Sequence, residues 1–294
     1  MNSHSVSENE LRRPSTPLNA DLLKTLAMII MLIDHIGAFL MDPGDPYYRT
    51  LRIIGRLAFP IFCFLMAEGA HFTRSMPKYL GRLAAFALIS TPPYNLVHGS
   101  PWYSCENINV FFTLFLGLAA VCSVSRLPRE VFRKLGRPGL ADSRAACLLA
   151  GLPLCLLCYM TAYWLDTDYG EYGVAAILLF WLLRKRPVAA WIGFSALTVF
   201  FFGFFIAVSD AYGVTSYSYM NLYNLVTEFF MKPRSELYFF PQIQLYAPLA
   251  CIPCLLYNGQ KGGKHSRIVQ YLFYAFYPVH LWCLWLIQLF AGIQ

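Results

Sequence analysis

The sequence predicts an all-α polytopic membrane protein with about nine transmembrane helices, its N-terminus inside and its C-terminus outside. Composition is the first observation: of 294 residues, 57% are hydrophobic and 13% charged, whereas ordinary soluble domains have roughly 25% charged residues. The mean hydropathy is +0.49. The second observation is that the apolar residues gather in stretches long enough to cross a bilayer. The third is that basic residues gather in alternate connections between these stretches.

The first apolar stretch sets the scale for the others. Leu22 to Met41 is a run of 20 residues, which as a helix rising about 1.5 Å per residue matches a hydrocarbon core of about 30 Å. Similar stretches predict the remaining spans, of which the sixth and the eighth are short. The nine predicted spans are residues 22–41, 50–71, 79–97, 108–125, 145–165, 172–184, 187–208, 243–257 and 268–291.

The distribution of basic residues predicts the orientation of these spans. Of the 23 Lys and Arg residues, 18 lie before or at the start of the first span or around the connections that follow even-numbered spans, and four lie around the other connections. The remaining one, Arg56, falls inside the second span. Because cytoplasmic loops carry the excess of Lys and Arg, the N-terminus is predicted to be cytoplasmic.

Two regions outside the spans have a polar composition. Residues 1–20, rich in Ser, Asn and Pro, predict a short disordered cytoplasmic tail, and residues 21–294 then form one transmembrane domain. Residues 209–242, rich in Tyr, Asn and Ser, predict an external loop. A loop that lies on the membrane surface and a lid over a site both fit this composition.

Two classes of ligand are not indicated. The net charge of +7 does not point to nucleic acid, because the basic residues lie in connections between spans. Nine cysteines include the pairs Cys155/Cys158 and Cys251/Cys254, but both pairs lie inside apolar stretches without a flanking His or acidic residue. Buried thiols behave as small hydrophobic groups, and zinc needs four ligands, so we expect no metal site.

The first two spans carry unusual charges. Asp34 and His35 are adjacent inside the first span, where a charged side chain costs at least about 2.5–3.5 kcal/mol and usually faces a protein interior or a wet cavity. Arg56 is expected at a similar depth, and its simplest role is to pair with Asp34. Pro60 removes a backbone donor four residues later, so a kink or a widened cavity is expected there.

Lys24 and His35 are predicted to share one face of the first helix. They are eleven residues apart, close to three full turns, which places them about 16 Å apart along the axis. Lys24 lies at the predicted cytoplasmic boundary. A role in anion binding and a role as a snorkelling anchor both fit that position.

Other polar residues suggest two further groups. Lys24, Arg74, Lys78 and Arg82, with Glu68, form a mostly basic inner rim, which suits phosphates and anionic lipid headgroups equally well. Deeper polar residues are candidates for binding a substrate: Asn95, Asn109, Thr113 and Tyr277. His280, next to Pro278 in the last span, is a second mid-membrane histidine and a candidate to line the same site.

Several segments occur in a recognisable order between about residues 22 and 291: IIMLIDHIGAFL, LRIIGRLAFPIFCFLMAEG, KYLGRLAAFALIS, NVFFTLFLG, DYGEYGV, LLYNGQKG and YLFYAFYPVHLWCLWLI. Together they resemble the TraX family, integral membrane proteins named for N-acetylation of conjugative pilin. That family is similar to membrane acyltransferases of the acyltransferase-3 type, in which a basic residue precedes a histidine by eleven positions on the first helix. Lys24 and His35 have this spacing, with Lys in place of the commoner Arg.

The resemblance implies an acetyltransferase of the bacterial cytoplasmic membrane. Acetyl-CoA would enter from the cytoplasm with its phosphates on the basic rim, and His35 would act as general base, tuned by Asp34 or Glu68. Arg56 or His280 would stabilise the oxyanion. The expected partners are membrane lipids and an acceptor amine or hydroxyl on a protein N-terminus, a glycan or a small molecule. Transfer can be direct or pass through an acetyl-histidine.

A transporter is the alternative from another functional class. The intramembrane residues Asp34, Arg56, Glu68 and His280 also fit a path for protons coupled to transport of a small molecule or a lipid. The sequence shows no internal repeat, which favours the enzyme over this alternative.

Overall fold

A computed structural model describes residues 18–105, 108–205, 243–260, 262 and 267–293. Every regular element within these residues is a helix. The predicted cytoplasmic tail up to residue 17 and the predicted external loop 209–242 lie outside the described residues.

The helices follow the predicted spans in order. The long and medium helices are α1 (Ala20–Leu40), α2 (Tyr48–Gly55), α3 (Ala58–Phe72), α4 (Met76–Val97), α5 (Val110–Lys134), α7 (Arg144–Trp164), α8 (Gly170–Leu182), α9 (Pro187–Thr198) and α14 (Arg267–Ala291). The short elements are α6 (Pro138–Asp142), the π-helix η2 (Val199–Phe205), the 3-10 helix η5 (Ala247–Ala250) and α13 (Cys251–Leu255).

Five of the described helical segments are long and apolar enough to cross a membrane: Ala20–Leu40, Tyr48–Phe72, Val110–Lys134, Arg144–Trp164 and Gln270–Ala291. The protein is therefore an all-α membrane protein. Shorter apolar helices cover Gly170–Leu182 and Pro187–Phe202. The count of nine crossings and their orientation remain predictions.

The eighth predicted span, 243–257, differs from its prediction. The structure has η5 and α13 there, together nine residues, which at about 1.5–2.0 Å per residue cover about half of a hydrocarbon core. Pro253 lacks the N–H that would bond the carbonyl of Leu249, so the 3-10 turn does not extend into one long helix.

The second predicted span is interrupted where Pro60 indicated a kink. Helix α2 ends at Gly55 and α3 begins at Ala58. The N–H groups of Arg56 and Leu57 bond back only three residues, to the carbonyls of Ile53 (3.2 Å) and Ile54 (3.1 Å). Pro60 has no N–H for the carbonyl of Arg56, so the helix cannot continue unchanged through this residue. The break turns the Arg56 side chain toward α1.

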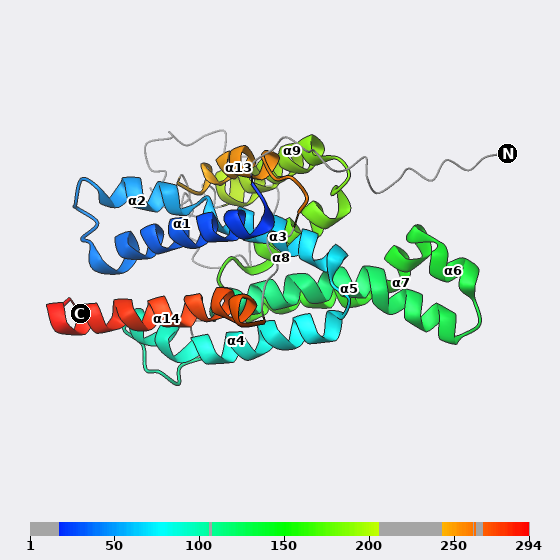
Figure 1. Cartoon of the computed structure of the whole chain (residues 1–294), viewed down its shortest axis with the longest axis horizontal. Helices are drawn as coiled ribbons and strands as arrows, with labels where there is room; N and C mark the ends of the chain where they lie inside the picture. Colours follow the sequence, from blue (N-terminus) through cyan, green and yellow to red (C-terminus); the bar gives the residue numbers. More distant parts are fainter. Residues whose placement is uncertain (1–17, 106–107, 206–242, 261, 263–266, 294) are drawn as a thin grey trace.

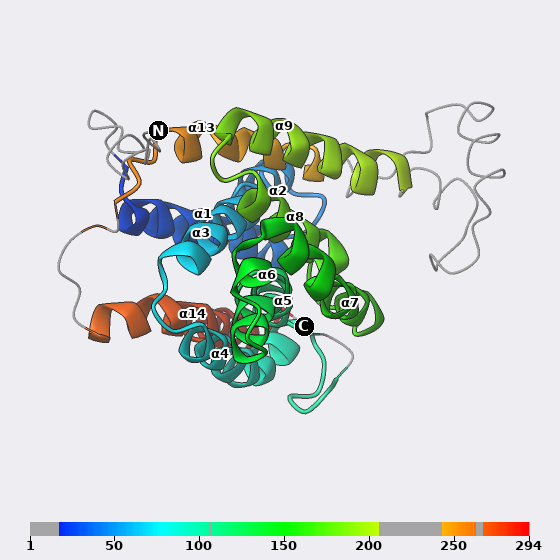
Figure 2. The ribbon, with the colours of Figure 1, turned by 90° about the vertical axis from the view of Figure 1, so that its right-hand side faces the viewer.

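The helices form a bundle in which α5 is the most central, with contacts to α3, α4, α6, α7 and α8. Helix α1 packs against α2, α3 and α14; α4 packs against α14 and α5; and α8 packs against α3 and α5. Figure 1 shows α1 and α14 running in the same direction, with the end of α14 at the opposite end of the molecule from the α5–α6–α7 turn. Helices α9 and α13 lie together on one face of the bundle (Figure 2).

Two glycines allow the helices to approach closely. A Cβ on Gly55 would lie 2.2 Å from the Cβ of Asp34, so α2 can pack against α1 at the charged residue only without a side chain there. A Cβ on Gly151 would lie 2.0 Å from the carbonyl oxygen of Ser123, which is backbone and cannot move aside. Gly151 therefore sets the separation of α5 and α7.

Candidate functional site

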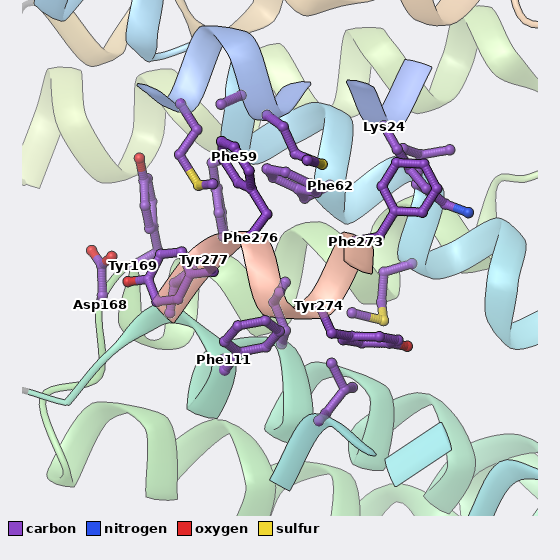
Figure 3. Close-up of a pocket in the computed structure, with 18 of the residues that line it drawn as sticks. Lys24, Phe59, Phe62, Phe111, Asp168, Tyr169, Phe273, Tyr274, Phe276 and Tyr277 are labelled. Carbon is purple, nitrogen blue, oxygen red and sulfur yellow. The ribbon is translucent and has the colours of Figure 1, made fainter. Parts of the chain in front are cut away.

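One cavity of about 880 Å³ runs through the bundle. Its walls come from α1, the α2–α3 region, α4, the start of α5, the turn before α8, and α14. Figure 3 shows Lys24 at one end and Asp168 at the other, with the aromatic rings of Phe62, Phe276 and other residues between them. The cavity therefore connects the predicted inner rim to the opposite end of α1.

Two cations line the inner end of the cavity. Lys24 Nζ lies 3.4 Å from Asp21 Oδ1 and 5.2 Å from the centre of the Phe273 ring, and its side chain is 38% exposed. The Arg82 guanidinium lies over the rings of Tyr79 and Tyr274, at 5.5 and 5.8 Å. These contacts leave both cations accessible from the cavity that they line.

The rest of the predicted basic rim is arranged differently. Arg74 and Lys78 are exposed and lie outside the lining of the cavity. Glu68 lines the cavity, but its carboxylate accepts a 2.6 Å hydrogen bond from Arg184 Nε, and that guanidinium also covers the Phe72 ring. The rim is thus narrower than predicted, and Glu68 is held in an ion pair.

A buried ion cluster lies farther along α1. Asp34 accepts from Arg56 Nη2 at 2.5 Å and from Arg52 Nη1 at 2.9 Å, with side chains only 10–11% exposed. The predicted pairing of Asp34 with Arg56 is confirmed. Arg56 also donates to the carbonyl of Arg52 at 3.2 Å and to Gln244 Oε1 at 3.4 Å. In these contacts one carboxylate, that of Asp34, is shared by two guanidinium groups next to the cavity.

His35 has a histidine partner rather than a carboxylate partner. Its Nδ1 lies 2.7 Å from Nε2 of His280, while the neighbouring Asp34 is held by the two arginines. His35 lines the cavity, whereas His280 is 5% exposed and lies behind it. The predicted place of His280 in the lining of the site is therefore corrected: α14 presents it to His35, not to the cavity.

Two predicted substrate ligands hold loops instead. Asn95 is fully buried and donates to the carbonyls of Ser104 (2.7 Å) and Trp102 (3.3 Å). Asn109 caps α5 by accepting from the N–H of Phe111 at 3.1 Å. Both lie outside the lining of the cavity. The Nδ2 groups of both donate to backbone carbonyls, and among the described residues the Oδ1 of Asn95 has no hydrogen-bond partner.

Thr113 also lies outside the lining, but Tyr277 belongs to it. Thr113 Oγ1 donates to the backbone oxygen of Asp168 and contacts Thr167 Oγ1, which fixes the turn before α8. Tyr277 packs edge-on against Phe111, with ring centres 5.2 Å apart. Among the described residues its buried hydroxyl has no hydrogen-bond partner.

The end of the cavity opposite Lys24 contains residues to which the sequence analysis gave no role in the site. Asp168 and Tyr169 line the cavity, and Tyr169 has φ 65°, a conformation uncommon for a residue with a side chain. Its ring stacks on Phe59 with centres 3.7 Å apart. Burial raises the pKa of the Asp168 carboxyl to about 6, although Arg56 opposes that rise. The strained backbone at Tyr169 is the local signal of a site, but it becomes visible only in the structure.

The described residues contain no group of three or more His, Cys, Asp or Glu side chains that could hold a metal ion.

Comparison with known proteins identifies the family. Residues 19–288 match the family model described as TraX protein. The chain belongs to the TraX family. A relative in Dichelobacter nodosus, named "Probable fimbrial assembly protein FimC, serogroup H1", is 27% identical over 269 residues, which cover 88% of this chain and 91% of the relative. An uncharacterized protein of Rickettsia prowazekii (strain Madrid E) is 59% identical over 44 residues, 15% of this chain and 16% of that protein. No solved structure matches this TraX-family chain.

Proposed function

We propose that this TraX-family protein is a membrane acetyltransferase that moves the acetyl group of acetyl-CoA to an amine or a hydroxyl. One observation carries the proposal: a single cavity is lined at one end by Lys24 of α1 and Arg82 of α4, and farther along by His35 of α1. The cations suit an anionic donor, and the imidazole suits proton transfer at neutral pH. Their arrangement in one continuous cavity supports a donor that reaches from one to the other.

Acetyl-CoA has the shape for this cavity. Its phosphates would bind Lys24 and Arg82, which is favourable because a charge-assisted hydrogen bond contributes about 1.5–3 kcal/mol. The thin pantetheine arm would lie along the apolar side chains of Met28, Met31 and Phe273, which also line the cavity. The arm has to cover about 16 Å, the rise of the eleven helical residues from Lys24 to His35, to bring the thioester to His35.

At the reacting end, His35 would accept the proton of the attacking amine or hydroxyl. The thioester oxygen becomes negative as the acceptor attacks, and a donor there stabilises the transition state. We assign this role to the hydroxyl of Tyr277, which has no hydrogen-bond partner among the described residues. Arg56 contributes through its charge, because its guanidinium nitrogens already bond Asp34, Gln244 and the Arg52 carbonyl.

The acceptor is proposed from the relatives. The Dichelobacter nodosus protein is named for fimbrial assembly, and this name supports a pilin-type acceptor that reaches the outer end of the cavity. With the inner rim facing the cytoplasm, where acetyl-CoA is made, the protein would lie in the bacterial cytoplasmic membrane.

A test uses the full chain in lipid nanodiscs. Calorimetry on the wild-type protein should show binding of acetyl-CoA. In cells, mass spectrometry of envelope molecules with and without the gene should show one acetyl group added to the acceptor. His35→Gln should bind acetyl-CoA normally but transfer about 10²–10⁴-fold more slowly, the usual loss for a general base.

The matched control is His71→Gln, since His71 is exposed and outside the lining of the cavity. This variant should keep wild-type transfer. Lack of acetyl-CoA binding by inserted wild-type protein would contradict the proposal and favour a proton-coupled transporter or flippase, for which His35 would be part of a proton path.

A further inference from the structure

The His35–His280 pair differs from a chance contact between two buried rings. The rings are 13° from parallel, with centres 4.9 Å apart and Nδ1 of His35 2.7 Å from Nε2 of His280. On its far side, His280 stacks against Phe276 at 5.0 Å. Only His35 of the two lines the cavity. His280 is therefore placed to act through His35.

The second nitrogen of His280 determines where the protons lie. His280 Nδ1 is 2.9 Å from the carbonyl oxygen of Phe276. A carbonyl oxygen only accepts, so this Nδ1 carries a proton. In a neutral imidazole the other nitrogen is then an acceptor, so His35 Nδ1 must donate to His280 Nε2. His35 Nε2 keeps its lone pair.

We infer that His280 is a positioning residue that holds His35 in the Nδ1–H form, with Nε2 turned away from the pair as the base for the acceptor's proton. The inference rests on the proposed function. The buried Asp of a Ser-His-Asp triad does the same for its histidine. Here the nearby carboxylate, Asp34, is bound by Arg52 and Arg56. The imidazole of His280 therefore has the role that the carboxylate has in the triad.

The reaction balances with this arrangement. As the acceptor nitrogen or oxygen bonds to the acetyl carbon, its proton moves to His35 Nε2. The carbon–sulfur bond then breaks, the thiolate of CoA takes that proton, and CoA leaves as the thiol. Both histidines return to their starting forms. During the step the positive charge of His35 is stabilised by the lone pair of His280 across the 2.7 Å hydrogen bond.

Two substitutions of His280 separate positioning from packing. His280→Gln retains an amide oxygen that can accept from His35 Nδ1, whereas His280→Leu fills the space without an acceptor. The leucine variant should lose about 100-fold in kcat with an unchanged KM for acetyl-CoA. The glutamine variant should stay within about 10-fold of wild type. Equal losses in both variants, or near-normal kcat in His280→Leu, would overturn the inference.

A spectroscopic test does not depend on activity. The chain has six histidines, so ¹⁵N-histidine NMR of the full protein in lipid, with His35→Gln to assign the signals, can report which ring nitrogen of His35 is protonated. Nδ1 protonated and Nε2 unprotonated is expected in the wild type, with a mixture in His280→Leu. An unprotonated Nδ1 in the wild type would overturn the inference. A different result separates the two proposals: His35 is protonated on Nδ1, but the protein neither binds acetyl-CoA nor transfers acetyl. That result would overturn the proposed function and the role of His35 as base. The assignment of the tautomer would stand.

Discussion

Lys24 and Lys78 lie near the same end of the molecule but differ in their surroundings. Lys24 lines the cavity beside Phe273, whereas Lys78 is exposed and outside the lining. A positive charge that only anchors a helix at the membrane surface would serve equally well at both positions. The two lysines are thus a matched pair for separating donor binding from anchoring.

Lys24→Ala should raise the KM for acetyl-CoA at least about 10-fold with little change in kcat, because a phosphate contact is common to the ground and transition states. Lys24→Arg should be mild, since the charge remains and Arg also binds phosphate. Lys78→Ala is the control and should leave both constants unchanged. Steady-state kinetics on correctly inserted protein measure this. An unchanged KM in Lys24→Ala would contradict the assignment of the donor phosphates to this end of α1.

Asp34 and His35 are neighbours in sequence but belong to different clusters. Successive residues of a helix point about 100° apart, so Asp34 faces α2 and its arginines while His35 faces α14. The charge of Asp34 is therefore used to keep Arg52 and Arg56 in the membrane interior. Removing one partner of such a buried cluster usually costs more than the cluster contributes, because charges are left unpaired.

At the scale of elements, the sequence predicted helix boundaries and breaks that depend on neighbouring residues alone. The predicted spans 145–165 and 268–291 coincide closely with α7 and α14, and the break at Arg56 follows from Pro60. The segment 243–257 misled the prediction because its composition is apolar while Pro248 and Pro253 limit the helices that it can form.

The site was predictable only as far as one helix extends. Lys24 and His35 share a face because of their spacing, and the cavity contains both. The contact of His35 with His280 joins residues 245 positions apart, and no helical period relates them. Asn95 and Asn109 were misjudged for a related reason. The sequence does not distinguish a buried Asn that donates to a backbone carbonyl from an Asn that binds a substrate.

The contact between α5 and α7 depends on one glycine. Gly151→Ala would place a methyl group 2.0 Å from the Ser123 carbonyl, and overpacking of this kind costs about 1–3 kcal/mol. The control is Gly81→Ala in α4, which has nothing within 4 Å of the new Cβ and should gain up to about 1 kcal/mol from helix propensity. Thermal unfolding in one lipid or detergent should therefore show a lower Tm for the first variant only. Equal Tm values for Gly151→Ala and wild type would show that this contact is not tight.

At the scale of the whole molecule, the described connections fall into two groups. Residues 98–105 and the turn before α8 lie at one end, joined through the Ile108–Thr167 bridge and the bond from Asn95 to Ser104. At the other end, Gln260 accepts from the N–H of Ala20 beside the start of α1, and Arg126 donates to Thr73. The cavity extends from one end to the other. A donor and an acceptor on opposite sides of a membrane could meet only in a cavity of this kind.

The final prediction concerns which end faces the cytoplasm and how often the chain crosses. From the 18-to-4 distribution of basic residues, reporter fusions after residues 135 and 262 should read cytoplasmic, and fusions near 103 and 220 should read external. If α1, α2–α3, α4, α5, α7, α8 and α14 each cross, the chain has seven crossings, and crossings by α9 and by the segment 243–255 would bring the count to nine. Both counts are odd, so both place the end of α14 outside. The two counts predict different sides of the membrane only for the fusion near residue 220. A cytoplasmic signal at 220 with the others as expected would mean seven crossings, because α9 and α13 would then stay on the inner side. An external signal at 135 would reverse the molecule, put Lys24 and Arg82 on the side without acetyl-CoA, and contradict the proposed donor path.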